Sequence, residues 1–232
     1  LDLIVHEIYG QSEGSGPTTV NRREATKFGS GGLPFPDTEV VLAEDGEILL
    51  KGRNVFLGYF RDPEATADTL IDSWLHSGDL GQFDEDGFLF IVGRKKEIII
   101  TSGGKNIAPK NIEAALKTLP LVSEAVIIGE RRKFLSALLT LNPDTAAQFA
   151  AENGIEGQIL HENPVVRDEI QRGIDEIVNP QFARVENVRK FEILPRDLTV
   201  EDGELTPTLK IKRRVVYDHF EDQIESMYAG LN

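Results

Sequence analysis

The chain of 232 residues is long enough for one large domain or two small ones, and its hydrophobic content of 40% is ordinary for a globular protein. Because it has no cysteine, it can form neither disulfides nor thiolate metal or redox sites, which fits a reducing compartment and a cytoplasmic location. The formal net charge of −14 disfavours binding to nucleic acid or to an anionic membrane surface.

The chain begins with Leu1 rather than Met, inside an apolar stretch, and we expect it to be a fragment of a longer protein. Its apolar runs fall far short of the ~20 residues that a membrane-spanning helix requires.

The first part of the chain alternates turn signals with short β-rich runs. Glu44-Asp45-Gly46 and Asp86-Gly87 are typical hairpin turns. A short helix is expected near residues 63–70. The expected strands cover residues 39–43, 47–51 and 88–92. Residues 1–94 are therefore predicted to form a small β-rich, barrel-like subdomain.

From Arg94 onward the pattern changes to strands interleaved with helices. Pro109 suits the first position of a helix that continues with apolar residues at helical spacing. The near-continuous apolar runs 122–128 and 134–141 predict central strands covered on both faces. The remaining expected elements are a strand at 187–194, a polar loop at 196–204 and a terminal helix from Arg213.

A core-facing helix is predicted to begin at Asn163-Pro164 and to end at Asn179-Pro180. Its apolar stripe comprises Val166, Ile170, Ile174 and Ile177. The elements together predict an α+β fold, in which the β-rich part is followed by a compact α/β domain with a central mixed sheet in residues 95–232.

The segment from Gly10 to Gly14 matches the GxSxG pattern that exposes a nucleophilic serine in α/β-hydrolases. That turn has to be followed directly by a helix, whereas the glycines and the proline that come next disfavour one. His161 or His219 could complete a Ser, Asp, His order with Ser12, but surface histidines explain both. A serine hydrolase on Ser12 is retained as a distant alternative.

A second set of polar residues suits nucleotide chemistry. Tyr9, Ser12 and Glu13 place an aromatic ring, a hydroxyl and a carboxylate in one glycine-containing turn. These groups suit a purine, a phosphate and a magnesium ion respectively. Asp79 follows a glycine, where its two oxygens can accept from both hydroxyls of a ribose.

Further along the chain, Arg94 and Lys96 supply cations, and Lys210 lies in a turn where it can approach a carboxylate or a phosphate. Each residue alone has a simpler account, as a turn residue, a solvated strand end or a basic helix start.

Taken in this order, the motifs resemble the adenylate-forming superfamily of acyl-CoA synthetases, adenylation domains and firefly-type luciferases. Tyr9 to Glu13 resembles its Tyr-Gly-x-Thr-Glu motif, with serine retaining the hydroxyl of threonine. Trp74 to Leu80 resembles its Thr-Gly-Asp motif, again with serine for threonine. Glu204 to Arg213 resembles the form found in long-chain synthetases. Gly31 departs from the family, where an aliphatic residue is more usual.

The resemblance implies that residues 1–94 end a large adenylation domain and that residues 95–232 form a mobile C-terminal domain. It implies an ATP-dependent long-chain fatty-acid–CoA ligase, which converts acid, ATP and CoA to acyl-CoA, AMP and pyrophosphate through an acyl-adenylate. The expected ligands are a fatty acid, ATP with Mg²⁺, and CoA. Because the family's phosphate loop lies upstream, the isolated chain is expected to be inactive.

The resemblance also assigns site residues. The expected catalytic residues are Lys210, Glu13 and Ser12, with Glu13 holding the metal ion. The expected nucleotide and CoA contacts are Tyr9, Gly10, Gln11, Ser12, Asp79, Arg94, Lys96, Ser102, Gly103, Gly104 and Lys105.

Within that set, Asp79 and Arg94 would hold the ribose. Lys96 would be the hinge about which the C-terminal domain rotates between the two half-reactions. The loop that begins at Ser102 would line the pantetheine tunnel during thioester formation.

Two further alternatives remain. A fatty acyl-AMP ligase or adenylation domain would share these motifs but pass the acyl group to a carrier protein, and CoA dependence separates the two. A non-catalytic binding module would do neither. The apolar substrate makes peripheral membrane contact plausible, although no amphipathic anchor is visible in the sequence.

Overall fold

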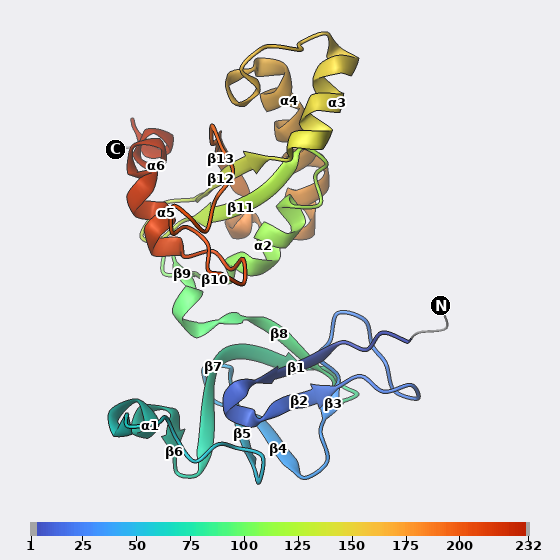
Figure 1. Cartoon of the computed structure of the whole chain (residues 1–232), viewed down its shortest axis with the longest axis vertical. Helices are drawn as coiled ribbons and strands as arrows, with labels where there is room; N and C mark the ends of the chain where they lie inside the picture. Colours follow the sequence, from blue (N-terminus) through green and yellow to red (C-terminus); the bar gives the residue numbers. More distant parts are fainter. Residues whose placement is uncertain (1–3, 231–232) are drawn as a thin grey trace. The chain divides into compact units, whose positions relative to one another are not determined.

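The computed structural model describes residues 4–230 of the chain, which divides between Glu97 and Ile98 into two compact units (Figure 1). The division directly follows the 3₁₀ segment η2 (Lys95–Glu97). The sequence had placed the boundary slightly earlier, between residues 94 and 95. The predicted α+β fold, with a β-rich first part and an α/β second part, is confirmed.

The first unit consists of short strands in two antiparallel sheets. One sheet has the order β1-β2-β3, and the other has the order β4-β5-β7-β6 with β8 also paired to β7. The elements are β1 (Ile8–Gln11), η1 (Ser12–Gly14), β2 (Gly16–Val20), β3 (Leu33–Pro34), β4 (Thr38–Leu42), β5 (Glu47–Gly52), α1 (Pro63–Thr69), β6 (Leu70–Ile71), β7 (Trp74–Phe83) and β8 (Leu89–Arg94).

Both predicted hairpin turns are present in this unit. Gly46 has a φ of 85°, a conformation that glycine adopts without steric cost. The Asp84 carboxylate accepts hydrogen bonds from the backbone N–H groups of Asp86 and Phe88, at 3.0 and 2.9 Å. The turns place Ile48 of β5 and Leu89 of β8 in one small buried core. The compact arrangement therefore follows from turn chemistry combined with strand alternation.

The second unit is built around a three-stranded sheet of order β11-β12-β13, which is antiparallel between the first pair and parallel between the second. The predicted mixed sheet is therefore confirmed. The elements are β9 (Ile99–Ile100), β10 (Asn106–Ile107), α2 (Pro109–Leu116), β11 (Val122–Ile128), β12 (Leu135–Leu141), α3 (Pro143–Asn153), η3 (Leu160–Glu162), α4 (Pro164–Gly173), η4 (Ile174–Val178), η5 (Asn179–Gln181), η6 (Arg184–Glu186), β13 (Val188–Ile193), α5 (Arg213–His219) and α6 (Glu221–Tyr228).

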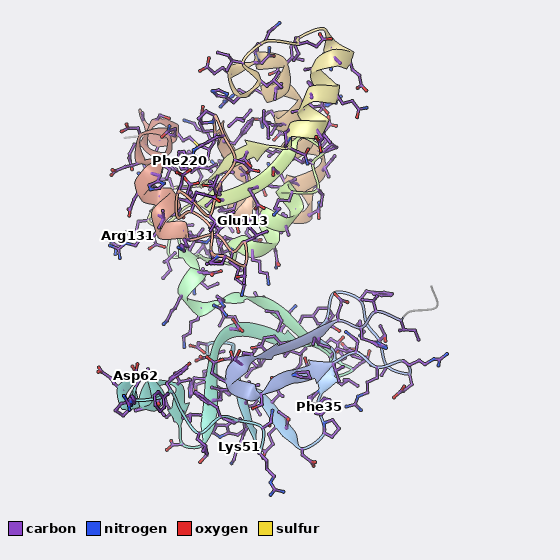
Figure 2. All side chains as sticks on the ribbon, in the orientation of Figure 1. Phe35, Lys51, Asp62, Glu113, Arg131 and Phe220 are labelled. Carbon is purple, nitrogen blue, oxygen red and sulfur yellow. The ribbon has the colours of Figure 1, made fainter. Side chains whose placement is uncertain are left out.

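Side chains alternate between the two faces of this sheet. Ala125 and Ile127 of β11 face a core shared with α2, α3 and α4, whereas Val126 and Ile128 face a second core shared with α5 and α6. Phe220, at the junction of α5 and α6, belongs to the second core (Figure 2). Burial on both faces explains why the strands of this unit are almost continuously apolar.

Three details of the second unit differ from the sequence predictions. Helix α3 was not predicted, although Asn142 caps it by accepting from two backbone N–H groups. The predicted apolar stripe is wrong at Ile177, which is 52% exposed. The helix widens to a π-helical turn in η4, and Val178 faces the core in place of Ile177. The terminal helix is interrupted at Phe220 and forms two short helices.

Over the residues that the structure describes, no helix is long and apolar enough to cross a membrane.

Candidate functional site

The carboxylate of Asp79 joins three strands of the first unit. Asp79 lies in β7 directly opposite Arg94 of β8, and its Oδ1 accepts a hydrogen bond from Arg94 Nε at 3.1 Å. Its Oδ2 accepts from the hydroxyl of Tyr9, which comes from β1 in the other sheet, at 2.9 Å. A carboxylate can accept about four hydrogen bonds, so both oxygens retain capacity for a ligand. Three residues that the sequence assigned to nucleotide binding thus form one cluster.

Tyr9 is held in place by its surroundings. Burial raises the pKa of the Tyr9 hydroxyl well above its ordinary value, so the group remains a hydrogen-bond donor to Asp79. Gly10 follows at a β-bulge, where a Cβ would come within 2.1 Å of the backbone oxygen of Gly16. The glycine is therefore required by the close approach of β2. Gln11 ends the strand opposite Gly16.

The bulge in β7 directly before Asp79, which comprises Ser77 and Gly78, is supported by a buried carboxylate that the sequence did not single out. Glu47 of β5 is 5% exposed, and its Oε1 accepts from the backbone N–H of Gly78 at 2.9 Å. Ser77 Oγ accepts from the backbone N–H of Asp79 at 3.1 Å. Gly78 has a φ of 71°, and a Cβ there would meet open space. These bonds fix the bulge, while the glycine keeps one side of it accessible.

The other oxygen of Glu47 contacts two basic side chains. It accepts from His76 Nδ1 at 3.2 Å and from Lys95 Nζ at 3.0 Å, and Lys95 also pairs with Asp45 at 2.6 Å. Burial alone would raise the pKa of the Glu47 carboxyl, but the bonds from Lys95, the Gly78 N–H and His76 lower it below its ordinary value. Glu47 thus connects the bulge beside Asp79 to the segment η2.

Glu13 is the predicted magnesium ligand. Its Oε1 accepts from the hydroxyl of Tyr59 at 2.8 Å, and Phe56 N–H donates to its backbone oxygen at 2.8 Å. Burial, together with the bond to Glu13, raises the pKa of Tyr59. Among the residues the structure describes, no three acidic or histidine side chains form a ready-made metal cluster. A single oriented carboxylate fits Mg²⁺, which commonly takes one or two carboxylates together with phosphates.

Ser12 does not lie in a nucleophile turn. It begins the three-residue 3₁₀ segment η1, after which Ser15 adopts a left-handed φ of 56° and the chain returns as β2, antiparallel to β1. A hydrolase nucleophile instead sits between a strand and a following helix. The backbone therefore does not support the serine-hydrolase alternative.

The predicted CoA loop connects β9 and β10 in the second unit. Thr101 N–H donates to Lys105 O at 3.1 Å, and Gly104 N–H donates to Thr101 O at 2.9 Å. Ser102, Gly103, Gly104 and Lys105 are all exposed. Gly104 has a φ of 71° with open space where a Cβ would be. The loop is therefore a tight, exposed turn whose backbone a ligand can approach closely.

Lys210 and Lys96 are both exposed. Lys210 lies in the segment between β13 and α5, within a small hairpin closed by a bridge between Leu205 and Ile211. Lys96 lies in η2, at the end of the first unit. Lys210 and the loop at Ser102 are separate elements of the second unit, so they do not form one cluster with Asp79 within a single unit.

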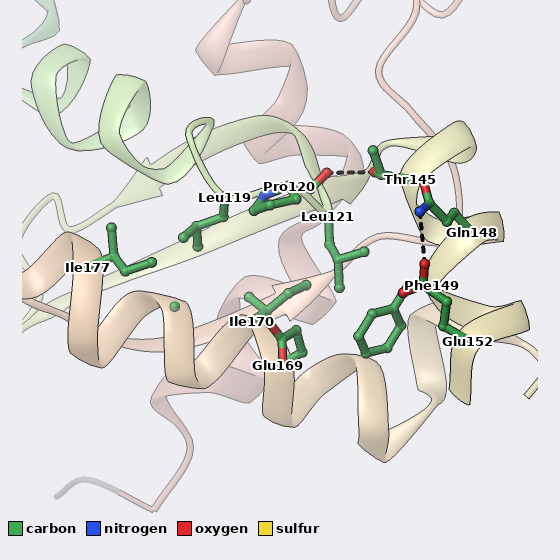
Figure 3. Close-up of a pocket in the computed structure, with 11 residues that line it drawn as sticks. Leu119, Pro120, Leu121, Thr145, Gln148, Phe149, Glu152, Glu169, Ile170 and Ile177 are labelled. Atoms are coloured by element: carbon green, nitrogen blue, oxygen red, sulfur yellow. Dashed lines mark hydrogen bonds between the residues drawn. The ribbon is translucent and has the colours of Figure 1, made fainter. Parts of the chain in front are cut away.

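A pocket in the second unit contains none of the assigned residues. It encloses about 290 Å³ and lies between α3, α4 and the loop before β11 (Figure 3). Its walls include Leu119, Phe149 and Ile170, with Glu152 and Glu169 at its edge. The residues that the sequence assigned lie in strands and loops that do not line this apolar cavity.

The second unit matches a known family. A family model described as the C-terminal domain of AMP-binding enzymes matches residues 96–232, which is more than half of the chain. The chain belongs to the AMP-binding enzyme family. The superfamily predicted from the motifs is therefore confirmed.

Curated relatives of this family cover almost the whole chain. A long-chain-fatty-acid–CoA ligase of Mycobacterium bovis is 42% identical over 230 residues, covering 97% of this chain and 38% of the relative. A long-chain-fatty-acid–CoA ligase of Xenopus laevis is 39% identical over 254 residues, covering 98% and 34% respectively. The chain thus spans little more than a third of the length of these relatives.

Solved structures show the same architecture. The o-succinylbenzoate CoA synthetase of Bacillus subtilis, in complex with its acyl-adenylate intermediate, matches with a TM-score of 0.69 at 27% identity, covering 90% of this chain and 40% of that one. The adenylation domain of a carboxylate reductase from Mycobacterium chelonae matches with a TM-score of 0.73 at 23% identity, covering 95% and 34%. The second likeness concerns the fold alone.

The Tyr9 environment explains the departure at Gly31. A Cβ at Gly31 would lie 2.7 Å from Tyr9 Cβ and 2.9 Å from Thr19 Oγ1, so an aliphatic side chain has no room. We predict that Gly31→Ala lowers the free energy of unfolding by about 1–3 kcal/mol, because neighbouring atoms have to move. The measurement is urea unfolding followed by the fluorescence of Trp74, the single tryptophan.

Gly14→Ala is the matched control, because its Cβ would meet Thr18 Oγ1 at an ordinary 3.5 Å. Its stability is expected to change by less than about 0.5 kcal/mol. Equal stability of the two variants would contradict the packing account.

Proposed function

We propose that the native protein is an ATP-dependent long-chain fatty-acid–CoA ligase. The proposal rests on one observation: Tyr9 and Arg94, which are far apart in the sequence, both donate hydrogen bonds to the carboxylate of Asp79. The chain in which this occurs is similar, over nearly its full length, to two proteins named long-chain-fatty-acid–CoA ligases. Ligand chemistry and relatedness thus indicate the same reaction.

The first unit supplies the nucleotide contacts. Asp79 uses its remaining acceptor capacity for the ribose hydroxyls, and Arg94 adds a donor beside it. Tyr9 orients the carboxylate through its hydroxyl. Glu13 would hold Mg²⁺, whose chemical contribution is to neutralise charge on the phosphates. A Bacillus subtilis CoA synthetase that is 26% identical was solved with ATP and a magnesium ion, which supports this ligand pair.

The second unit supplies groups for the chemistry. In adenylation, the fatty-acid carboxylate attacks the α-phosphorus of ATP and pyrophosphate leaves. The Lys210 ammonium offsets the negative charge that develops between these groups. In the second half-reaction the CoA thiolate attacks the acyl carbonyl and AMP leaves, while the Ser102–Lys105 loop contacts CoA. Because this loop and Lys210 are separate exposed elements, we propose that each serves one half-reaction.

Rotation about Lys96 between the half-reactions, a cytoplasmic location and peripheral membrane contact stay predictions from the sequence. The same holds for the acceptor, which would be a carrier protein in the alternative reading.

The proposal is tested by AMP release from the full-length native protein given palmitate and ATP with Mg²⁺. We expect steady AMP release that requires CoA, because the acyl-adenylate has no other thiol acceptor in the assay. Steady release on addition of a carrier protein, with none on addition of CoA, would favour the alternative ligase. Absence of AMP release under all of these conditions, across a panel of carboxylic acids, would contradict both.

Lys210→Ala tests whether Lys210 serves adenylation alone. We predict that adenylate formation falls by at least about 100-fold, since one charge-stabilising group is lost. Thioester formation from supplied palmitoyl-adenylate should be largely retained. Lys212→Ala removes the same charge two residues later from another exposed position and should leave adenylation within about twofold. An equal loss of both half-reactions in Lys210→Ala would refute the assignment.

A further inference from the structure

The hairpin that carries Lys210 has a defined backbone. Thr206 N–H donates to Lys210 O at 2.8 Å, and Lys210 N–H donates to Thr206 Oγ1 at 3.0 Å. Leu209 adopts a left-handed φ of 58°, which turns the chain directly before Lys210. The lysine side chain is exposed, so its position depends on how this hairpin is attached to the rest of the unit.

The start of the hairpin is attached to the rest of the unit through the carboxylate of Glu204, a residue that is 0% exposed. Both of its oxygens accept from the guanidinium of Arg196, at 2.8 and 2.7 Å. Thr199 N–H donates to Oε2 at 3.0 Å, and His219 Nδ1 lies 3.0 Å from Oε1. One carboxylate therefore connects the start of the hairpin to the preceding loop and to the end of α5.

The hairpin is also fixed after Lys210. Lys212 N–H donates to the backbone oxygen of Glu204 at 2.7 Å, which closes the base of the hairpin. Arg213 then donates to Glu113 of α2 at 2.6 Å. Glu113 in turn accepts from the backbone N–H of Ile127 in β11 at 2.8 Å. Both ends of the Lys210 segment are thus tied to the central elements of the unit.

The Glu204 carboxylate is ionised throughout the physiological pH range. Its bidentate bond to Arg196 outweighs burial and, with the bond to His219, lowers the pKa of Glu204 to about 2. Glu204 is the buried member of this pair, whereas Arg196 is exposed, so loss of the Glu204 charge would weaken the bonds from Arg196, Thr199 and His219 and allow the backbone that they hold to rearrange. Such a rearrangement would reach the hairpin first.

We infer that Glu204 is a positioning residue for adenylation, which fixes the hairpin so that Lys210 is presented in one orientation. The inference rests on the proposed function. Glu204 is 0% exposed and therefore inaccessible to a ligand, and the four bonds of its carboxylate are all made to residues of the second unit. A misplacement of about 1 Å can cost about 100-fold in rate, so such a residue can control catalysis from a distance.

The experiment measures both half-reactions of Glu204→Gln in the full-length native protein. We expect the kcat of palmitoyl-adenylate formation to fall by about 10- to 100-fold, because the hairpin loses its fixed geometry. The KM for ATP should stay within about threefold, because the nucleotide contacts lie in the other unit. Thioester formation from supplied palmitoyl-adenylate should be unchanged.

Val166→Ala is the control for a loss of stability alone. Val166 is 0% exposed in α4 and packs on the opposite face of the sheet from the hairpin. It should lower Tm to a similar extent while leaving both half-reactions intact. If Glu204→Gln impairs both half-reactions equally, or matches Val166→Ala in adenylation, the inference is overturned.

If Glu204→Gln does not fold, Arg196→Lys provides a second test of whether the Glu204 carboxylate positions the hairpin. It keeps the positive charge but loses the paired donors, so a smaller, selective loss of adenylation is expected. A loss shared by both half-reactions would overturn the inference. A wild-type protein that forms no adenylate would overturn the proposed function as well. Normal adenylation by Lys210→Ala would instead remove this inference and leave the ligase proposal standing.

Discussion

The carboxylate of Asp79 is the interaction on which the first unit depends. A buried charge is stable only when its hydrogen-bond partners are supplied, and here they come from Tyr9 in one sheet and Arg94 in the neighbouring strand. The bonds that orient the carboxylate therefore also connect β1 of one sheet to β7 and β8 of the other. Loss of those bonds would affect stability and the proposed ribose contact together.

Buried carboxylates recur as supports for exposed functional groups. Glu47 holds the bulge at Gly78, Glu204 holds the start of the Lys210 hairpin, and Glu113 holds Arg213 after it. All three glutamates are buried, whereas Gly78 is half-buried and Lys210 is exposed. A buried support of this kind can hold the backbone of a segment in one position while the side chains on that segment remain in solvent.

Local sequence patterns predicted much of the fold. The hairpin at Gly46, the helix at Pro109 and the runs that became β11 and β12 depend on turn chemistry and apolar periodicity, which neighbouring residues determine. Helix α3 was missed although Asn142-Pro143 gives the same start signal as Asn163-Pro164. The exposure of Ile177 could not be predicted, because a π-helical turn shifts the register of the stripe.

The candidate site was predictable only in part, for a similar reason. The motif order indicated Tyr9, Asp79 and Arg94, and the structure places them in contact. Glu47 and Glu204 were not singled out, although Glu47 directly follows the predicted hairpin turn at Gly46 and Glu204 begins the segment that resembles long-chain synthetases. Their importance comes from partners such as Gly78 and His219, which only the folded chain brings to them. A carboxylate in the sequence does not reveal whether it will be buried.

Recognition of the ATP ribose by the fixed Asp79 carboxylate can be tested by comparing ATP with 2′,3′-dideoxy-ATP. The measurement is kcat/KM for AMP formation by the full-length wild type and by Asp79→Asn. We predict that the wild type prefers ATP by about 100-fold or more, and that the preference falls to within several-fold in the variant. An undiminished preference for ATP in Asp79→Asn would contradict it.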